Sequence, residues 1–381
     1  MESYLDNSAT TRVYPEVADI VVKLMTEDYG NPSSLHRKGV DAEHYIKNST
    51  KIIADSLRCQ MDEIIYTSGG TESNNMAIIG TALAKRRKGK HIVVSAIEHA
   101  SVLEVMKFLE KEGFEVTYIG TDEKGVVDPQ DFKDAVREDT ILVSCMMINN
   151  EIGALQPVAE IAKLCKKKNP DVIIHSDCIQ AYGKVSIIPQ KMGIDLMSVS
   201  GHKIHGPKGS GFLYVKKGTL LRPIIYGGGQ QKGMRSGTQN VPAIAGLAKA
   251  VEITFKDFDK KIEYITSLRD RLRSELTKIE DVYDNTGEAC HIASLSFKGV
   301  RAEVMLHTLE DKGVYVSSGS ACSSNSAKKL SGVLNAIGLD KELLESTLRF
   351  SFSDMNTIEE VDYAISVVKE ILPQLRHYKR G

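Results

Sequence analysis

Short apolar segments alternate with helical stretches through the first two thirds of the chain, and this alternation restricts the possible folds most. Segments of strand length are expected at 64–67, 91–95, 114–119, 140–148, 172–175, 194–199 and 211–215. Strands that alternate with helices form a mainly parallel sheet with helices on both faces. Functional side chains gather at the carboxyl ends of such strands. We therefore predict an α/β fold with its site along one edge of the sheet.

The last third of the chain has a different pattern. Two segments, at 291–297 and 347–352, alternate polar and apolar residues like half-exposed strands. Two helical patterns accompany them, at 301–312 and 356–376. This mixture is typical of a small α+β domain. A helical run from Asn240 to about Lys278 is expected to lead out of the large domain. We expect residues 15–256 to form the large domain, and residues 1–14 with 257–381 to form the small one.

Composition excludes several classes of function. The formal net charge is -1, so the sequence gives no electrostatic case for binding nucleic acid or an anionic membrane. No apolar run approaches the ~20 residues that span a bilayer, and the first residues do not resemble a signal peptide. We expect a cytoplasmic protein. The spacings of His175 with Cys178 and of His202 with His205 are weak metal signals, and no metal site is predicted.

The segment Ser198–Gly209 places a lysine, Lys203, between a predicted strand and a turn that contains glycine and proline. A lysine held by a stiff backbone can form a Schiff base with an aldehyde if its surroundings favour the neutral amine. The alternative is a solvated loop lysine, and this segment alone leaves both open.

A second segment is typical of an anion site. A predicted strand is followed by Ser68–Asn75, which contains two glycines, and then by the helical 76–80. The free N–H groups at such a helix start bind phosphate. The amide of Gly70 and the side chain of Thr71 are the candidate ligands. No G-K-[ST] sequence follows, so this is not a Walker loop, and an ordinary capped helix is the alternative.

Other predicted strand ends carry His99, Asn150, Asp177 and Gln180. Each of these residues, taken alone, is more often structural, as a helix cap, a turn residue or a capped core histidine. Together with Lys203 they complete a set: a Schiff-base lysine, a phosphate site, a carboxylate for a pyridinium nitrogen and a histidine that covers a ring. This set is what pyridoxal phosphate requires of a protein.

Three loops add further candidates. The glycine-rich Tyr226–Thr238 is predicted to be an ordered functional loop. The turn around Asn31 is interpreted as lying on the substrate side, with a plain loop as the alternative. Cys322 stands among small, flexible residues, unlike a structural cysteine, which favours a reactive thiol on a mobile loop at about 317–331.

The motifs also resemble a known family. They are Glu-His at 98–99, Asn-Asn-Glu-Ile-Gly at 149–153, Ser-Ser-Gly-Ser-Ala-Cys at 317–322, and the segments 5–11, 198–209 and 233–238. In order and over nearly the whole chain, they resemble the group I cysteine desulfurases of the NifS/IscS type. The resemblance implies a fold-type I pyridoxal-phosphate transferase, in which a large domain has a mainly parallel seven-stranded sheet covered by helices. It also implies a homodimer.

The resemblance implies a role for each residue at the cofactor. Lys203 binds pyridoxal 5'-phosphate, Asp177 pairs with the pyridine nitrogen, and Gln180 bonds the ring hydroxyl. His99 stacks on the ring and moves protons. The phosphate is expected to contact Gly70, Thr71, Ser200, His202 and, from the second subunit, Thr238.

The substrate implied is L-cysteine. Asn150 and Arg349 would hold its carboxylate, and Asn31 would also lie at the substrate. Cys322 would attack the sulfur, release alanine and keep a persulfide. The sulfur would then pass to an acceptor protein, such as an iron–sulfur scaffold or a tRNA-thiolation enzyme.

Three alternatives remain at this point. An aminotransferase or a selenocysteine lyase could share the fold, although an aminotransferase would not need Cys322. A non-catalytic scaffold would not be expected to retain both Lys203 and Cys322. Cys178, which lies between Asp177 and Gln180, is interpreted as an inert packing residue.

Overall fold

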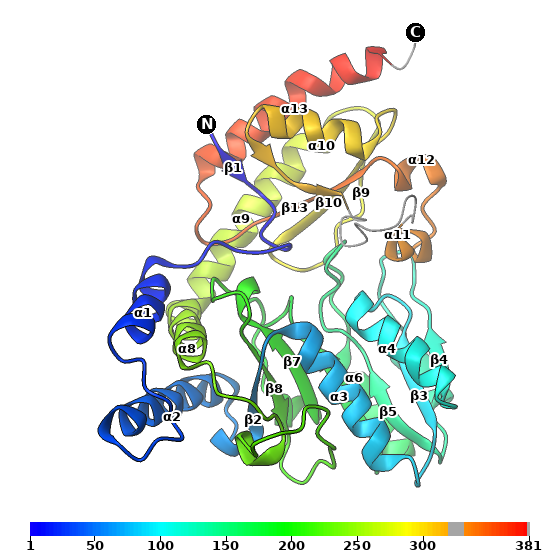
Figure 1. The fold of residues 1–381 in the computed structure, drawn as a ribbon. Helices are drawn as coiled ribbons and strands as arrows, with labels where there is room; N and C mark the ends of the chain where they lie inside the picture. Colours follow the sequence, from blue (N-terminus) through cyan, green and yellow to red (C-terminus); the bar gives the residue numbers. More distant parts are fainter. Residues whose placement is uncertain (319–330, 379–381) are drawn as a thin grey trace.

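The computed structural model describes residues 1–318 and 331–378, and Figure 1 shows them in two parts, each built around one sheet. The lower part in that view contains the seven-stranded sheet, and the upper part contains the four-stranded sheet and the short pair β1-β11. Both chain ends lie in the upper part. The predicted loop residue Cys322 lies outside the described residues.

The seven-stranded sheet has the order β2-β8-β7-β6-β5-β3-β4. Its strands are β2 (Ile64–Thr67), β3 (His91–Ser95), β4 (Glu115–Ile119), β5 (Thr140–Ser144), β6 (Ile173–Asp177), β7 (Leu196–Ser200) and β8 (Gly211–Val215). The run from β7 to β4 is parallel, and β8 is antiparallel to both of its neighbours. The predicted mainly parallel sheet is therefore confirmed.

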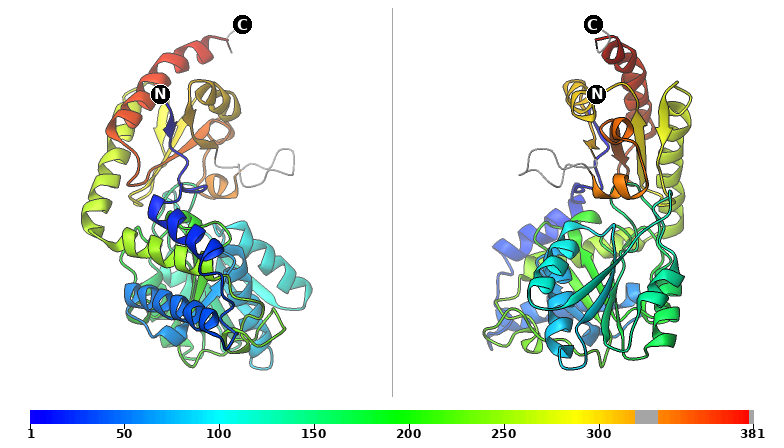
Figure 2. Two further views of the ribbon diagram at one scale, coloured as in Figure 1. Left: turned by 60° about the vertical axis from the view of Figure 1, so that its left-hand side comes forward. Right: turned by 90° about the vertical axis from the view of Figure 1, so that its right-hand side faces the viewer.

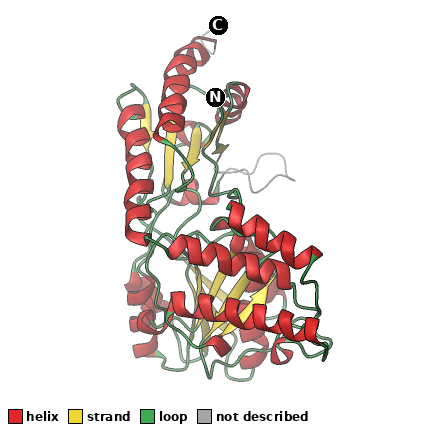
Figure 3. Ribbon diagram, turned by 90° about the vertical axis from the view of Figure 1, so that its left-hand side faces the viewer, coloured by secondary structure: helices red, strands yellow, loops and turns green. Residues whose placement is uncertain are grey.

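Helices cover both faces of this sheet. On one face α3 (Gly70–Lys85) and α4 (Ala100–Lys111) pack their apolar side chains against the strands. The other face packs against α1, α2, α5, α6 and α8, which span Pro15–Thr26, Arg37–Leu57, Pro129–Ala135, Val158–Lys168 and Val241–Phe255. Figure 3 shows helices lying across the strands from the side of α1 and α2. Burial on both faces explains why the central strands are uninterrupted apolar runs in the sequence.

The small sheet has the order β12-β13-β10-β9 and is antiparallel. Its strands are β9 (Val282–Asp284), β10 (Ile292–Phe297), β12 (Ser317–Ser318) and β13 (Thr347–Ser351). The apolar side chains of α9 (Phe258–Leu276), α10 (Ala302–Asp311) and α13 (Ile358–Tyr378) share one core with this sheet. β1 (Ser3–Tyr4) pairs with β11 (Val314–Tyr315), which ties the N-terminus to this part.

The predicted helix from Asn240 to Lys278 is wrong in one respect, because the structure contains two helices there. The backbone of Lys256 is extended, and Asp257 has φ +53°, in the left-handed region. This pair of conformations interrupts the helical hydrogen bonds, and α9 leaves α8 in a new direction (Figure 2). We propose this break as the boundary between the two domains.

Two further expected boundaries differ from the structure. The helix expected from residue 76 begins at Gly70, because the turn before it is completed by Gly69 at φ +148°. The strand expected at 140–148 ends at Ser144. No helix in the described part of the chain is long and apolar enough to cross a membrane.

Candidate active site

Neighbouring strands of the large sheet carry polar residues at their carboxyl ends. β6 ends at Asp177, and the segments after β3 and β5 hold His99 and Asn150. Lys203 follows β7 in a short 3-10 turn. Because β7, β6, β5 and β3 are consecutive parallel strands, these four residues lie along one edge of the sheet, as the strand pattern predicts.

The N-terminal segment holds the amine of Lys203. Its Nζ donates to the carbonyl oxygen of Ser8 and, at 2.7 Å, to that of Ala9. Gln180 Nε2 donates to the same Ser8 oxygen at 3.0 Å, and Gln180 Oε1 lies 3.2 Å from Nε2 of the buried His291. One backbone carbonyl of a segment from the small domain therefore fixes both the lysine and the glutamine.

Asp177 is buried beneath this edge. Its burial raises the pKa of the carboxyl, since a charge in an apolar interior is poorly solvated. The backbone N–H of Ile179 at 2.9 Å and the amide Nδ2 of Asn74 at 2.7 Å act in the opposite direction by stabilising the carboxylate. The charge of Lys203 also favours the ionised form.

His99 caps the N-terminus of α4. Its Nδ1 accepts from the backbone N–H of Ser101 at 3.1 Å, and Ser101 Oγ lies 2.8 Å away. Ser101 Oγ in turn accepts from Asn74 Nδ2 at 2.9 Å. The sequence analysis missed Asn74 and Ser101. The signal for Ser101 is its place two residues after a capping histidine, whereas nothing local marks Asn74.

The first turn of α3 packs closely against the segment after β6. A Cβ on Gly70 would lie 2.1 Å from Ile179 Cδ1, so a side chain at this position would require Ile179 to move. Ser200 borders the turn, since a Cβ on Gly69 would lie 3.5 Å from its Oγ. Thr71 is exposed at the same helix start. These three residues are the ones expected at a phosphate, and they meet at a helix N-terminus.

Arg349 reaches the site from β13 of the small domain. Its Nη1 donates to the backbone oxygen of Asn150 at 2.8 Å, and its Nη2 donates to Asp6 Oδ1 at 2.9 Å. Its Nε is buried and has no partner among the described residues. The structure thus brings Asn150 and Arg349 together across the two domains. Asp6 orients the guanidinium and was missed by the sequence analysis.

The hydrogen bonds described above do not include three other predicted site residues, Asn31, Thr238 and His202. Asn31 is exposed, and its Oδ1 accepts from the N–H of Ser33 within its own turn. Thr238 is exposed on the loop after β8. Burial lowers the pKa of His202 to about 4, and its Nδ1 lies 3.2 Å from Thr10 Oγ1. Their roles at substrate or phosphate stay predictions.

The described residues on either side of the Cys322 segment reach the same edge. Before it, Ser317 of β12 pairs with Arg349 of β13. After it, the Ser331 hydroxyl donates to Glu151 Oε2 at 2.5 Å, and burial raises the pKa of Glu151 to about 7. Both flanks of the segment are thus attached beside the proposed substrate arginine.

The five cysteines in the described residues lie in surroundings that suppress reactivity. Burial raises the pKa of every one of them: Cys59, Cys145, Cys165, Cys178 and Cys290. Since the thiolate is the nucleophile, none of these five is suited to attack sulfur.

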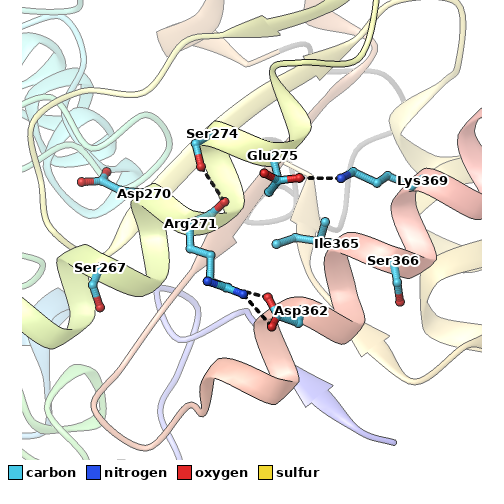
Figure 4. Close-up of a pocket in the computed structure, with 9 residues that line it drawn as sticks. All are labelled: Ser267, Asp270, Arg271, Ser274, Glu275, Asp362, Ile365, Ser366 and Lys369. Atoms are coloured by element: carbon cyan, nitrogen blue, oxygen red, sulfur yellow. Dashed lines mark hydrogen bonds and ion pairs between the residues drawn. The ribbon is translucent and has the colours of Figure 1, made fainter.

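A surface hollow in the small domain differs from this site. It lies between α9 and α13, and Figure 4 shows its lining side chains. Arg271 pairs with Asp362 there, and Lys278 and Lys369 hold the pKa of Glu275 at about 2. These charges compensate one another, whereas the strand-end site contains buried polar atoms without protein partners.

The residues at the strand ends fit pyridoxal phosphate. Ser8 Oγ, Asn74 Oδ1 and Arg349 Nε are buried and unpartnered within the described structure. Together with the helix N-terminus at Gly70 and the buried carboxylate of Asp177, they provide polar groups suited to a small anionic ring compound. The lysine that would bind its aldehyde lies on the adjacent strand end.

Comparisons with known proteins agree with this assignment. The aminotransferase class-V profile matches residues 3–364. The cysteine desulfurase IscS of Methanosarcina thermophila is 44% identical over 377 residues, which cover 98% of this chain and 93% of the relative. A solved NifS-like protein superposes with a TM-score of 0.93 at 38% identity, covering 98% of this chain and all of its own. The structure of SspA in complex with cysteine gives a TM-score of 0.81 at 31% identity, covering 93% of this chain and all of its own.

The chain belongs to the aminotransferase class-V family of pyridoxal-phosphate-dependent enzymes. Within that family it falls in the IscS and NifS-like group of cysteine desulfurases. The predicted fold type and cofactor, and the resemblance seen in the motifs, are therefore confirmed.

Proposed function

We propose that this protein converts L-cysteine to L-alanine and retains the sulfur as a persulfide on Cys322. The observation that supports it best is the convergence of Lys203, Asp177 and His99 on one sheet edge, opposite the buried Arg349. The guanidinium of Arg349 is suited to the carboxylate of an amino acid.

The described residues divide the work at the cofactor. When bound, pyridoxal phosphate withdraws electrons from the substrate's α-carbon. Asp177 would keep a negative charge at the ring nitrogen, Gln180 would bond the ring hydroxyl, and His99 would cover the ring and carry a proton at an imidazole nitrogen. Lys203 would anchor the cofactor through its amine.

The turn at α3 is proposed for the phosphate. Gly70, Thr71, Ser200 and His202 would bind it, supported by the helix N-terminus and the absence of a side chain at Gly70. Asn31 and Asn150 are proposed to complete the substrate site.

Cys322 is proposed as the attacking thiol, because the other five cysteines are all poor thiolates. We expect Cys322→Ser to bind cysteine, seen as a change in the cofactor's absorbance, while alanine and sulfide formation fall to background. Cys178→Ala is the matched control and should keep most of the turnover, since that thiol is buried with a raised pKa. Near-normal turnover of Cys322→Ser would disprove the persulfide mechanism.

A homodimer is proposed, in which Thr238 completes the phosphate site of the second subunit. In support, Thr238 and Tyr226 are exposed on one loop. Large apolar side chains are also exposed on and after α1, namely Val22, Met25, Tyr29 and Leu35. A second copy would bury such a surface.

A mixed dimer tests this sharing. One subunit carries Lys203→Ala and the other Thr238→Ala, each of which should inactivate the homodimer. If Thr238 acts across the interface, both changes fall in the same site and the other site stays intact, so about half of the activity remains. Activity near zero would contradict the sharing.

The acceptor is proposed to be a protein of iron–sulfur cluster assembly or of tRNA or cofactor thiolation. Lys328 and Lys329, which lie outside the described residues, add positive charge beside Cys322 and favour an acidic acceptor surface. Reversing both to Glu should slow persulfide transfer to that acceptor and leave sulfide release to a small thiol unchanged. The cytoplasmic location remains a prediction.

A further inference from the structure

Hydrogen bonds join Asp177 to His99 through two residues to which the proposed function gives no role. Asn74 is fully buried in α3, and its Nδ2 donates to Asp177 Oδ2 at 2.7 Å and to Ser101 Oγ at 2.9 Å. Ser101, in the first turn of α4, places its Oγ 2.8 Å and its backbone N 3.1 Å from His99 Nδ1. The connection runs from the end of β6 to the segment after β3 by way of two helices.

Chemistry fixes the direction of these hydrogen bonds. The backbone N–H of Ser101 can only donate, so His99 Nδ1 must accept, and the proton of the neutral ring is on Nε2. Asn74 must direct its NH2 group at Asp177, because its carbonyl oxygen would be repelled by the carboxylate. Both hydrogens of that group are then used, so the Ser101 hydroxyl, which accepts from Asn74, directs its own hydrogen at His99.

We propose that Asn74 and Ser101 are positioning residues that hold Asp177 as a carboxylate and keep His99 in the tautomer protonated on Nε2. This inference rests on the proposed function, in which Asp177 faces the ring nitrogen and His99 covers the ring. The other tautomer would set the Nδ1–H of His99 against the N–H of Ser101. One network thus fixes the ionisation of one group and the proton position of the other.

Nitrogen-15 NMR of histidine-labelled protein reports the tautomer of His99 directly, with and without pyridoxal phosphate. Its signals are assigned by their loss in His99→Asn. We expect the wild-type proton on Nε2 and a hydrogen-bonded Nδ1. Ser101→Ala keeps the backbone donor but removes the hydroxyl, so the Nδ1 signal should move toward that of a free imidazole, and Ser101→Thr should restore it. A wild-type ring protonated on Nδ1 would overturn the proposal.

Kinetics provide a second readout. Ser101→Ala should lower kcat about tenfold, the effect of one hydrogen bond of ordinary strength, with KM for cysteine changed less than twofold. Asn74→Ala should speed cofactor release about tenfold, because Asp177 loses the hydrogen bond that Asn74 donates to it. Unchanged His99 signals together with unchanged kcat in Ser101→Ala would refute the proposal. A wild-type enzyme that made no alanine would instead refute the proposed function, since the NMR result does not depend on turnover.

Discussion

The two sheets present their polar residues in different ways. In the large sheet, the central strands β3, β5, β6 and β7 are buried throughout, and the site residues follow at their carboxyl ends. In the small sheet, β10 and β13 are also buried throughout, but their two faces differ. One face belongs to the apolar core and includes Ala293, Leu295, Phe297, Leu348 and Phe350. The other is mainly polar and includes Ser294, Ser296, Thr347, Arg349 and Ser351.

This difference shows two ways in which a sheet can place polar side chains at a site. The large sheet is a rigid apolar support whose strand ends position Lys203 and Asp177. The small sheet uses the period of two along a strand, so that its polar face meets the large domain while its apolar face packs on helices. The register sets Ser294 opposite Arg349. The strand ends should therefore govern chemistry, and the polar face should govern substrate binding.

The largest effect is expected at a strand end. Lys203→Ala should lose the cofactor's visible absorbance band and lower alanine formation by at least ~1000-fold, because the covalent anchor is gone. Absorbance spectroscopy and an alanine assay measure both. Lys208→Ala, on an exposed position of the same segment, is the control and should resemble the wild type. An unchanged absorbance band in Lys203→Ala would show that Lys203 is not the covalent anchor of the cofactor.

A smaller effect is expected on the polar face. Arg349→Gln should raise KM for cysteine by about 10–100-fold, the value of hydrogen bonds to a charged group, with a smaller change in kcat. Steady-state kinetics give both numbers. Arg271→Gln breaks an exposed ion pair with Asp362 and should cost only ~0–1 kcal/mol of stability, without kinetic effect. If Arg349→Gln changed kcat and left KM intact, the proposed division of labour would be wrong.

The buried Glu98, which follows β3, should make the stability of the protein depend on pH. Burial raises its pKa from 4.5 to about 8, so between these values the folded protein holds a proton that the unfolded chain has released. Unfolding then releases that proton, and stability falls as the pH rises through this window. The glutamine in Glu98→Gln cannot titrate. Between pH 6 and 8 the unfolding free energy of the wild type should therefore fall by about 1–2 kcal/mol more than that of Glu98→Gln. Urea unfolding at both pH values measures this, and parallel pH profiles would show that Glu98 is charged when folded.

The smallest effect is expected at Ser294, whose buried Oγ has no partner among the described residues. Ser294→Ala should be neutral or stabilising by up to ~1 kcal/mol, because an unsatisfied hydroxyl is removed. Ser296→Ala, on the same face, loses contacts of 2.7 Å with both Thr347 Oγ1 and Asn285 Nδ2, and should destabilise by about 1–2 kcal/mol. Thermal unfolding measures the stability of both variants. Equal losses of stability would mean that the Ser294 hydroxyl also has a hydrogen-bond partner.

Much of the fold follows from local sequence. The strand at 91–95 matches its expected bounds, and the strand at 114–119 differs from β4 by one residue. Runs of buried apolar residues mark such strands, because both faces of the sheet are covered. The break at Asp257 escaped prediction, since the flanking residues have ordinary helical composition. The left-handed backbone of Asp257 separates α8 from α9, whose apolar side chains belong to the core of the small sheet.

The sequence by itself determined the order of the elements and the strand-end residues Lys203, Asp177 and His99, because hydrophobic periodicity and turn residues act over a few positions. Only the tertiary structure decided which atoms meet there. Asn74 bonds Asp177 across 103 residues, and Arg349 bonds Asp6 across 343. No local pattern encodes such pairs, since each depends on the relative placement of two whole elements. That placement is set by the packing of many apolar side chains together.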